Sequence, residues 1–273
     1  MKCYVEGIPI FYQEYGKGVP IVCLHGFPED HKSLTGCLEP IFQSVEGYRR
    51  IYIDLPGMGK SGSNKSIKNA DDMLKVLKTF IDIVIKEENF LLIGQSYGGY
   101  LSLGLTLQLK KKIDGMLLIC PCVVADKEKR EVPQKRIIEC DEGFTDFSKE
   151  DKDFNDFMEY AVVATKGTWK RYKNEVLPGL LVANKSFTKK YQKEGYGFSF
   201  DVEINNLTFD KPTCILLGRQ DNCVGYMDTL KLIDNFSRAT FVVLDAAGHN
   251  LQLERSKLFE ANVIDWLARI RTG

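Results

Sequence analysis

The sequence predicts an α/β fold built on a mostly parallel sheet. Short apolar runs that are typical of buried strands recur along the chain, and segments with helical spacing of apolar residues lie between them. Strands that alternate with helices indicate a parallel sheet covered by helices. The chain has 273 residues, 44% of them hydrophobic, which is enough for one such domain with an insertion.

The predicted elements follow from these patterns in chain order. Residues 1–15 alternate like a strand, and Gly7 divides them into a hairpin with arms at Tyr4-Val5 and Ile8–Glu14. Further strands are predicted at Ile21–Leu24, Arg50–Ile53, Phe90–Ile93, Met116–Ile119, Cys214–Leu217 and Thr240–Leu244. Helices are predicted over Ala70–Lys86, Tyr100–Leu109 and Leu251–Arg271.

The alternation breaks between Cys122 and Asn206. This stretch is charged, and it carries aromatic residues, several at helical spacing: Phe144, Phe147, Phe154, Phe157, Tyr160, Trp169 and Tyr172. We therefore expect a core made of residues 1–121 and 207–273, and a helical insertion over residues 122–206. The aromatic side chains either pack on each other or line a substrate pocket, and both can hold.

Ser96 is the predicted nucleophile. The apolar run Phe90–Ile93 leads into Gly94-Gln95-Ser96-Tyr97-Gly98, and a helical segment follows. A Gly-x-Ser-x-Gly turn between a strand and a helix exposes its serine hydroxyl above the sheet, and the glycines leave room for the sharp bend.

A serine hydroxyl needs a base, and histidine is suited to this because its pKa lies near neutrality. The chain has three histidines: His25, His31 and His249. His249 follows the apolar run of residues 241–247 and Gly248, so it lies in a loop at a strand end, where it can meet the serine. We predict that His249 is the base.

The third member is a carboxylate that orients the imidazole. Asp221 follows the strand Cys214–Leu217 and Gly218, and we favour it over two rivals. Asp245 is too close in sequence to His249 to fold back onto it, and Asp126 lies in a charged, solvated stretch. The resulting order of Ser, Asp and His along the chain is the one expected of α/β-hydrolases.

Two backbone N–H groups are predicted to form an oxyanion hole. One belongs to Tyr97, the residue after the nucleophile, and the other to Phe27, in the loop after an early strand. Pro28 has no N–H to offer. On this interpretation His25 braces the loop, and His31 is a loop or helix-start residue.

The chain resembles the α/β-hydrolase superfamily in five motifs, which run in the family order. They are His25–Pro28, Asp54–Ser61, Gly94–Gly98, Gly218–Asp221 and Gly248-His249. The resemblance implies the α/β-hydrolase fold: a mostly parallel eight-stranded sheet, flanked by helices, with residues 122–206 as a cap, or lid, over the strand ends. Members with this His-Gly-x-Pro loop include haloalkane dehalogenases and epoxide hydrolases, but these use an aspartate where this chain has Ser96.

Members with a serine nucleophile include carboxylesterases, lactonases, carbon–carbon bond hydrolases, proline iminopeptidases and cofactor-free haloperoxidases. We predict a serine hydrolase that cleaves a small ester through an acyl-enzyme, because alcohols leave more easily than amines. The predicted reaction requires no metal or cofactor. The alternatives are a carbon–carbon bond hydrolase or lactonase with the same triad, and a small-molecule receptor with slow turnover.

Composition excludes several other partners. The 37 Lys and Arg residues balance 37 Asp and Glu residues, so neither nucleic acid nor an acidic membrane surface is expected. No apolar run approaches the roughly 20 residues of a membrane-spanning helix, and no signal peptide is apparent. We expect a cytoplasmic protein that acts on a small molecule; the oligomeric state stays open.

Three other motifs are weak. Cys120-Pro121-Cys122 lacks the usual Cys-x-x-Cys spacing, and the eight cysteines are expected to act as free, mostly apolar residues. Gly57–Gly62 matches a dinucleotide-binding pattern, but a polar loop follows it instead of a helix. A P-loop would need a glycine where Asp54 stands.

Overall fold

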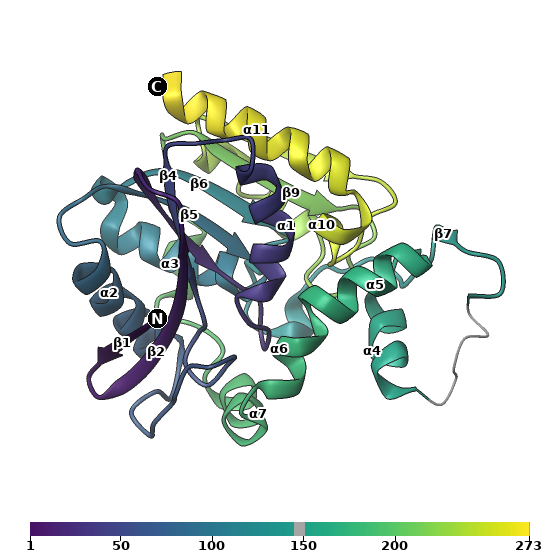
Figure 1. Cartoon of the computed structure of the whole chain (residues 1–273), viewed down its shortest axis with the longest axis horizontal. Helices are drawn as coiled ribbons and strands as arrows, with labels where there is room; N and C mark the ends of the chain where they lie inside the picture. Colours follow the sequence, from purple (N-terminus) through teal and green to yellow (C-terminus); the bar gives the residue numbers. More distant parts are fainter. Residues whose placement is uncertain (145–150, 273) are drawn as a thin grey trace.

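A single sheet organises the molecule in the computed structural model, which describes residues 1–144 and 151–272 (Figure 1). Its strands run in the order β1-β2-β4-β3-β5-β6-β9-β10. β2 is antiparallel to both of its neighbours, and the other pairings are parallel. This confirms the predicted eight-stranded, mostly parallel sheet. The strands are β1 (Lys2–Val5), β2 (Ile8–Tyr15), β3 (Val19–Leu24), β4 (Tyr48–Ile53), β5 (Phe90–Gln95), β6 (Ile113–Ile119), β9 (Thr213–Gly218) and β10 (Ala239–Leu244).

Helices cover the sheet on both sides. In Figure 1, α1 and α11 lie in front of the sheet and α3 lies behind it. The main helices outside the insertion are α1 (Lys32–Phe42), α2 (Ala70–Val84), α3 (Tyr97–Leu109), α10 (Leu251–Glu254) and α11 (Ser256–Thr272). The prediction of one continuous helix over Leu251–Arg271 is wrong, because the helix is interrupted at Arg255 and the segment forms two helices, α10 and α11.

The parallel strands bring distant loops to one edge. β5 is buried along its whole length, as its apolar sequence predicts. Leu24 of β3 is in register with Gly94, and Gln95 is in register with Ile119 of β6. The loops that follow β3, β5, β6, β9 and β10 therefore leave the sheet at the same edge, where parallel α/β sheets bind their ligands.

The predicted insertion, residues 122–206, lies between β6 and β9 in the chain. It contains the short strands β7 (Glu139–Cys140) and β8 (Val163–Ala164), which pair with each other and were not predicted. Its helices are α4 (Lys152–Tyr160), α5 (Lys166–Glu175), α6 (Leu177–Val182), α7 (Lys185–Glu194) and α8 (Asp201–Ile204). Phe147, one of the aromatic residues noted in the sequence, lies outside the described residues.

The aromatic residues of the insertion form a hydrophobic cluster distinct from that of the sheet. We call it the second cluster; its buried members are Phe144, Phe154, Phe157, Ala161, Ala164, Trp169, Tyr172, Val176, Leu177 and Leu253. Leu253 belongs to α10, so this cluster joins α4 and α5 to the core. The division into a core and a separate cap domain stays a prediction.

The glycine-rich turn after β4 has a structural use. The Asp54 carboxylate accepts hydrogen bonds from the backbone N–H groups of Lys60 and His31, at 2.7 and 2.8 Å. No helix starts there, since α2 begins only at Ala70, so the geometry of a dinucleotide site is missing.

Within residues 1–144 and 151–272, we find no helix that combines the length and the apolar character that a bilayer crossing requires. The cytoplasmic location stays a prediction.

Candidate active site

Ser96 sits in a strained turn between β5 and α3. Its φ and ψ angles are 52° and −116°, in the left-handed region that non-glycine residues rarely adopt. A Cβ on Gly98 would lie 2.0 Å from the carbonyl oxygen of Leu24, so glycine is needed for this close approach. The turn has the geometry of the predicted strand–turn–helix motif.

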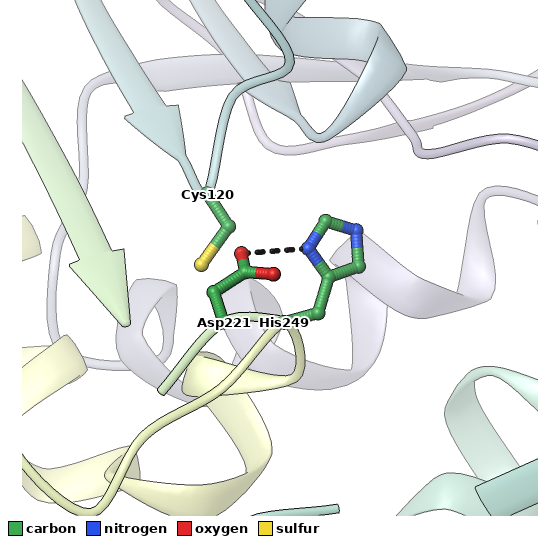
Figure 2. A group of neighbouring side chains, drawn as sticks. All are labelled: Cys120, Asp221 and His249. Carbon is green, nitrogen blue, oxygen red and sulfur yellow. Dashed lines mark hydrogen bonds and ion pairs between the residues drawn. The ribbon is translucent and has the colours of Figure 1, made fainter. Parts of the chain in front are cut away.

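The structure brings the three predicted triad side chains together. The His249 Nε2 atom lies 2.9 Å from the Ser96 hydroxyl, and its Nδ1 atom lies 2.9 Å from Asp221 Oδ2. Figure 2 shows the second of these contacts, with His249 and Asp221 reaching toward each other from two separate loops. Because a carboxylate can only accept, Nδ1 carries the hydrogen, which leaves Nε2 free to accept the serine proton.

Asp221 is anchored by backbone groups. Its side chain is fully buried, and its Oδ1 atom accepts hydrogen bonds from the N–H groups of Cys223 and Val224, at 2.8 and 3.1 Å. Both carboxylate oxygens are therefore engaged, one by the loop and one by His249. This holds the imidazole in a single orientation.

The environment of His249 favours its charged form. Burial lowers the pKa of His249, but the Asp221 carboxylate and the nearby Cys223 sulfur more than offset this effect. The pKa is raised well above the usual value of 6.5. The site therefore stabilises the imidazolium that would form when the serine proton is transferred.

The rival acids are placed elsewhere. Asp245 is exposed, and the side-chain amide of Gln220 donates to it at 2.7 Å. Asp126 is exposed as well and pairs with Lys129 at 3.2 Å. Neither carboxylate makes a hydrogen bond with His249 in the described structure.

The other two histidines have structural roles. His25 accepts a hydrogen bond from the N–H of Leu55 at its Nε2 atom, at 3.0 Å, so its Nδ1–H donates to the Gly26 carbonyl at 2.7 Å. His31 precedes α1, with its Nδ1 atom 2.7 Å from Asp54. Both side chains are buried and brace loops, as the sequence predicted for His25.

The N–H groups of Phe27 and Tyr97, which the sequence predicts to form an oxyanion hole, have no acceptor in the described structure. Tyr97 is the first residue of α3, where the helix dipole favours negative charge. The Phe27 and Tyr97 rings contact each other edge to face, with centroids 5.8 Å apart, which links the loop after β3 to the start of α3.

Cys120 lies beside the triad. Its Sγ atom, a carboxylate oxygen of Asp221 and a ring nitrogen of His249 lie within 4.8 Å of one another (Figure 2). The thiol is fully buried and donates to the Gly248 carbonyl at 3.5 Å, and burial holds its pKa well above the usual value of 9.0. With the Asp221 oxygens already engaged, this group is better described as a hydrogen-bonded support of the triad than as a metal site.

A cavity of about 870 Å³ opens onto Ser96 and His249. The loop after β3 contributes Phe27, Pro28 and Glu29 to its lining, and most other lining residues come from the insertion. A space of this size accommodates a small organic substrate.

Sequence reasoning missed Glu29. It directly follows the Phe27-Pro28 pair, but only 7% of its surface is exposed, and it lines the cavity together with Ser96 and His249. The signal was an acidic pair, Glu29-Asp30, directly after the predicted oxyanion loop. The backbone of this pair packs closely against Gly179 in α6 of the insertion.

Comparison with known proteins identifies the family. A family profile described as the alpha/beta hydrolase fold matches residues 19–256. The chain belongs to the alpha/beta hydrolase family. It is similar to the crystal structure of an alpha/beta superfamily hydrolase from Oenococcus oeni, with 32% identity, 99% coverage of both chains and a TM-score of 0.91.

More distant members of the alpha/beta hydrolase family carry different names. A Mycoplasma pneumoniae protein named as an esterase/lipase is 24% identical, over 95% of this chain and 93% of its own length. A 2-hydroxy-6-oxo-6-(2'-aminophenyl)hexa-2,4-dienoic acid hydrolase from Metapseudomonas resinovorans is 22% identical, over 98% and 92%. The family is thus shown, whereas the bond that is cleaved differs among the relatives.

Proposed function

We propose that this alpha/beta hydrolase cleaves small esters through a Ser96–His249–Asp221 triad and an acyl-enzyme. The observation that carries the proposal is the continuous hydrogen-bond chain from Asp221 through His249 to the Ser96 hydroxyl, at 2.9 Å for each link, with Ser96 and His249 in the lining of the cavity. This is the arrangement in which a histidine activates a serine for attack on a carbonyl.

The first half of the reaction forms the acyl-enzyme. His249 takes the proton from Ser96 while the hydroxyl oxygen attacks the ester carbonyl carbon, and the carbonyl oxygen becomes negative. The N–H groups of Phe27 and Tyr97 donate to this oxygen, each worth about 3–4 kcal/mol of barrier. The carbon–oxygen bond to the alcohol then breaks, and the imidazolium gives its proton to the leaving alcohol.

The second half releases the acid. A water molecule attacks the acyl carbon as His249 takes one of its protons, and the serine leaves with that proton. Asp221 stabilises the imidazolium in both halves. We propose that the insertion acts as the cap that covers this step, because its residues supply most of the cavity lining.

A second candidate is carbon–carbon bond hydrolysis with the same triad. The similarity to the dienoic acid hydrolase over nearly the whole chain supports this candidate. An ester stays our first choice because the Mycoplasma pneumoniae esterase/lipase is also similar over nearly the whole chain.

A fluorophosphonate probe tests the proposal directly. We expect stoichiometric labelling of Ser96, and loss of labelling in the Ser96→Ala variant. With p-nitrophenyl butyrate, Ser96→Ala and His249→Ala are each expected to lower kcat/KM by about 10⁴-fold or more. Near-normal turnover in either variant would refute the triad.

Two further measurements separate an esterase from a receptor and from a carbon–carbon bond hydrolase. Steady turnover after the first acylation supports an enzyme, whereas a single acylation followed by slow release supports a receptor. Faster cleavage of a vinylogous 1,5-diketone acid than of any ester in a panel would support the carbon–carbon bond hydrolase.

A further inference from the structure

One side of the cavity gathers acidic and phenolic side chains. We call it the acidic wall; its members are Glu29, Asp156, Glu159, Tyr160 and Tyr172, and all of them line the cavity. They come from three places in the fold: the loop after β3, helix α4 and helix α5. The triad reaction described above uses none of them.

Glu29 is the most buried acid of the acidic wall, and one of its carboxylate oxygens lacks a hydrogen-bond partner. Its Oε2 atom is buried and has no hydrogen-bond donor among the residues that the structure describes. Burial raises the pKa of Glu29, and the groups that act on it next most strongly are Ser33, His25, His249 and Asp30, none of them a lysine or arginine. An unpaired buried carboxylate oxygen costs free energy, and a positive charge on a bound ligand would offset part of that cost by electrostatic attraction.

The other members of the acidic wall act on one another and on Glu29. Burial raises the pKa of Tyr172, and the charges that raise it further are Glu29, Asp156 and Asp153. The pKa of Tyr160 is raised by burial too, and the acids Glu159 and Asp156 add to the effect. The described part of the chain shows no ion pair between a Lys or Arg and Glu29, Asp156 or Glu159.

The basic residues of the cavity lining are occupied or lie at its rim. The half-buried Arg130 guanidinium donates to the carbonyls of Val124, Ala125 and Cys223, at 2.8, 3.1 and 3.2 Å. Lys127 and Lys193 are exposed. Among the residues that the structure describes, no lysine or arginine is paired with the acidic wall, and the basic groups that act on Glu29 are the imidazoles of His25 and His249.

We propose that the acidic wall binds an organic ammonium group, so that the preferred substrates are esters that carry a positive charge. The inference rests on the ester hydrolysis proposed above. Carboxylates supply the opposite charge, and the faces of the two phenol rings attract a cation as well. An ammonium group beside Glu29 also favours the charged form of this carboxyl, which the empty cavity disfavours.

Matched pairs of esters test the inference. On the alcohol side, butyrylcholine is compared with its uncharged carbon analogue, 3,3-dimethylbutyl butyrate. On the acyl side, the p-nitrophenyl ester of 4-(trimethylammonio)butyrate is compared with that of 5,5-dimethylhexanoate. We expect the charged ester to have the higher kcat/KM in at least one pair, by about tenfold or more.

Variants locate the effect. In the pair that shows the preference, Glu29→Gln and Asp156→Asn should each bring the ratio of kcat/KM for the charged ester to kcat/KM for the uncharged ester toward one. Asp156→Asn still tests the inference if Glu29→Gln fails to fold. Glu194→Gln is the matched control, because Glu194 is an exposed acid that lines the cavity outside the acidic wall. Its ratio should equal that of the unmodified protein.

The outcomes separate this inference from the proposed function. Ratios of one or less in both pairs, with Ser96 still labelled by the fluorophosphonate, would overturn the ammonium site and leave the hydrolase intact. A ratio that survives both acid substitutions would overturn the assignment to the acidic wall. Failure of Ser96 to be labelled, with no ester cleaved, would instead contradict the proposed function.

Discussion

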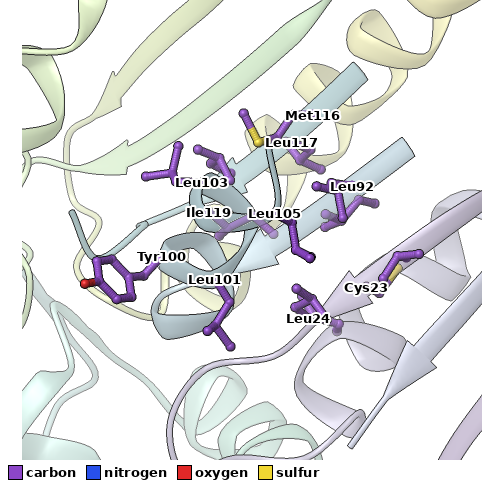
Figure 3. Close-up of a cluster of buried hydrophobic side chains, with 14 of the residues drawn as sticks. Cys23, Leu24, Leu92, Tyr100, Leu101, Leu103, Leu105, Met116, Leu117 and Ile119 are labelled. Atoms are coloured by element: carbon purple, nitrogen blue, oxygen red, sulfur yellow. The ribbon is translucent and has the colours of Figure 1, made fainter. Parts of the chain in front are cut away.

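The edge of the sheet and the insertion that faces it are held together by different means. Next to this edge, α3 packs against the face of the sheet formed by β3, β5 and β6, through buried apolar side chains such as Leu24, Leu92 and Leu101 (Figure 3). The triad residues then emerge from turns in which backbone groups fix each side chain. The geometry of this region follows from strand register and a few hydrogen bonds.

The insertion relies on the second cluster and on side chains. Phe157 packs against Trp169 and Tyr172, each with ring centroids 5.3 Å apart, and Tyr172 in turn lines the cavity. No strand of the main sheet passes through this region. Under the proposed function, the edge of the sheet supplies the reacting groups, and the insertion supplies the shape and charge of the pocket.

The largest expected effect concerns the edge. Asp221→Asn should lower kcat/KM for p-nitrophenyl butyrate by about 10⁴-fold, because an amide no longer stabilises the imidazolium and can favour the wrong tautomer. Asp245→Asn is the matched control: it is exposed, lies four residues before His249, and should keep normal activity. If the two variants were equally active, Asp221 would have no role as the third member.

A smaller effect on kcat/KM is expected from pH, and it also depends on the His249–Asp221 pair. His249 can accept the serine proton only when it is neutral, so kcat/KM should rise with pH and level off above the pKa of His249. Because that pKa is raised, the midpoint should lie above 6.5, with a tenfold loss for about each pH unit below it.

The same measurement on Asp221→Asn sharpens the test. Removing the carboxylate removes the charge that raises the pKa, so the midpoint of the residual activity should move to lower pH. A midpoint that stays in place would mean that another group, and not His249 beside Asp221, controls the profile.

The two regions also differ in how far they could be predicted. The Gly94–Gly98 turn, the loop around Phe27 and the strand-end positions of Asp221 and His249 carry local signals, because each needs particular residues at fixed spacing. Parallel strands then place these loops at one edge without further information. The structure accordingly brings the predicted side chains together.

The insertion could be predicted only as a helical, aromatic segment. Its short strands β7 and β8 have two residues each, too few for any alternation to be read. Glu29 illustrates the same limit, since this acid is buried and its backbone packs against Gly179, which is far away in sequence. Packing between elements decides which side chains face a cavity, so a local sequence pattern does not predict them.

The smallest expected effect on activity concerns the second cluster. Phe157→Ala should reduce the free energy of unfolding by about 3–5 kcal/mol, as should Phe80→Ala in α2, because both remove a large buried ring. Phe157→Ala should also raise KM for p-nitrophenyl butyrate by about fivefold with little change in kcat, since Tyr172 loses its support while the triad does not. Chemical denaturation and steady-state kinetics on the two variants measure both quantities. If Phe157→Ala lost stability but kept a normal KM, the second cluster would have no part in shaping the pocket, and the division between the two regions would have to be drawn elsewhere.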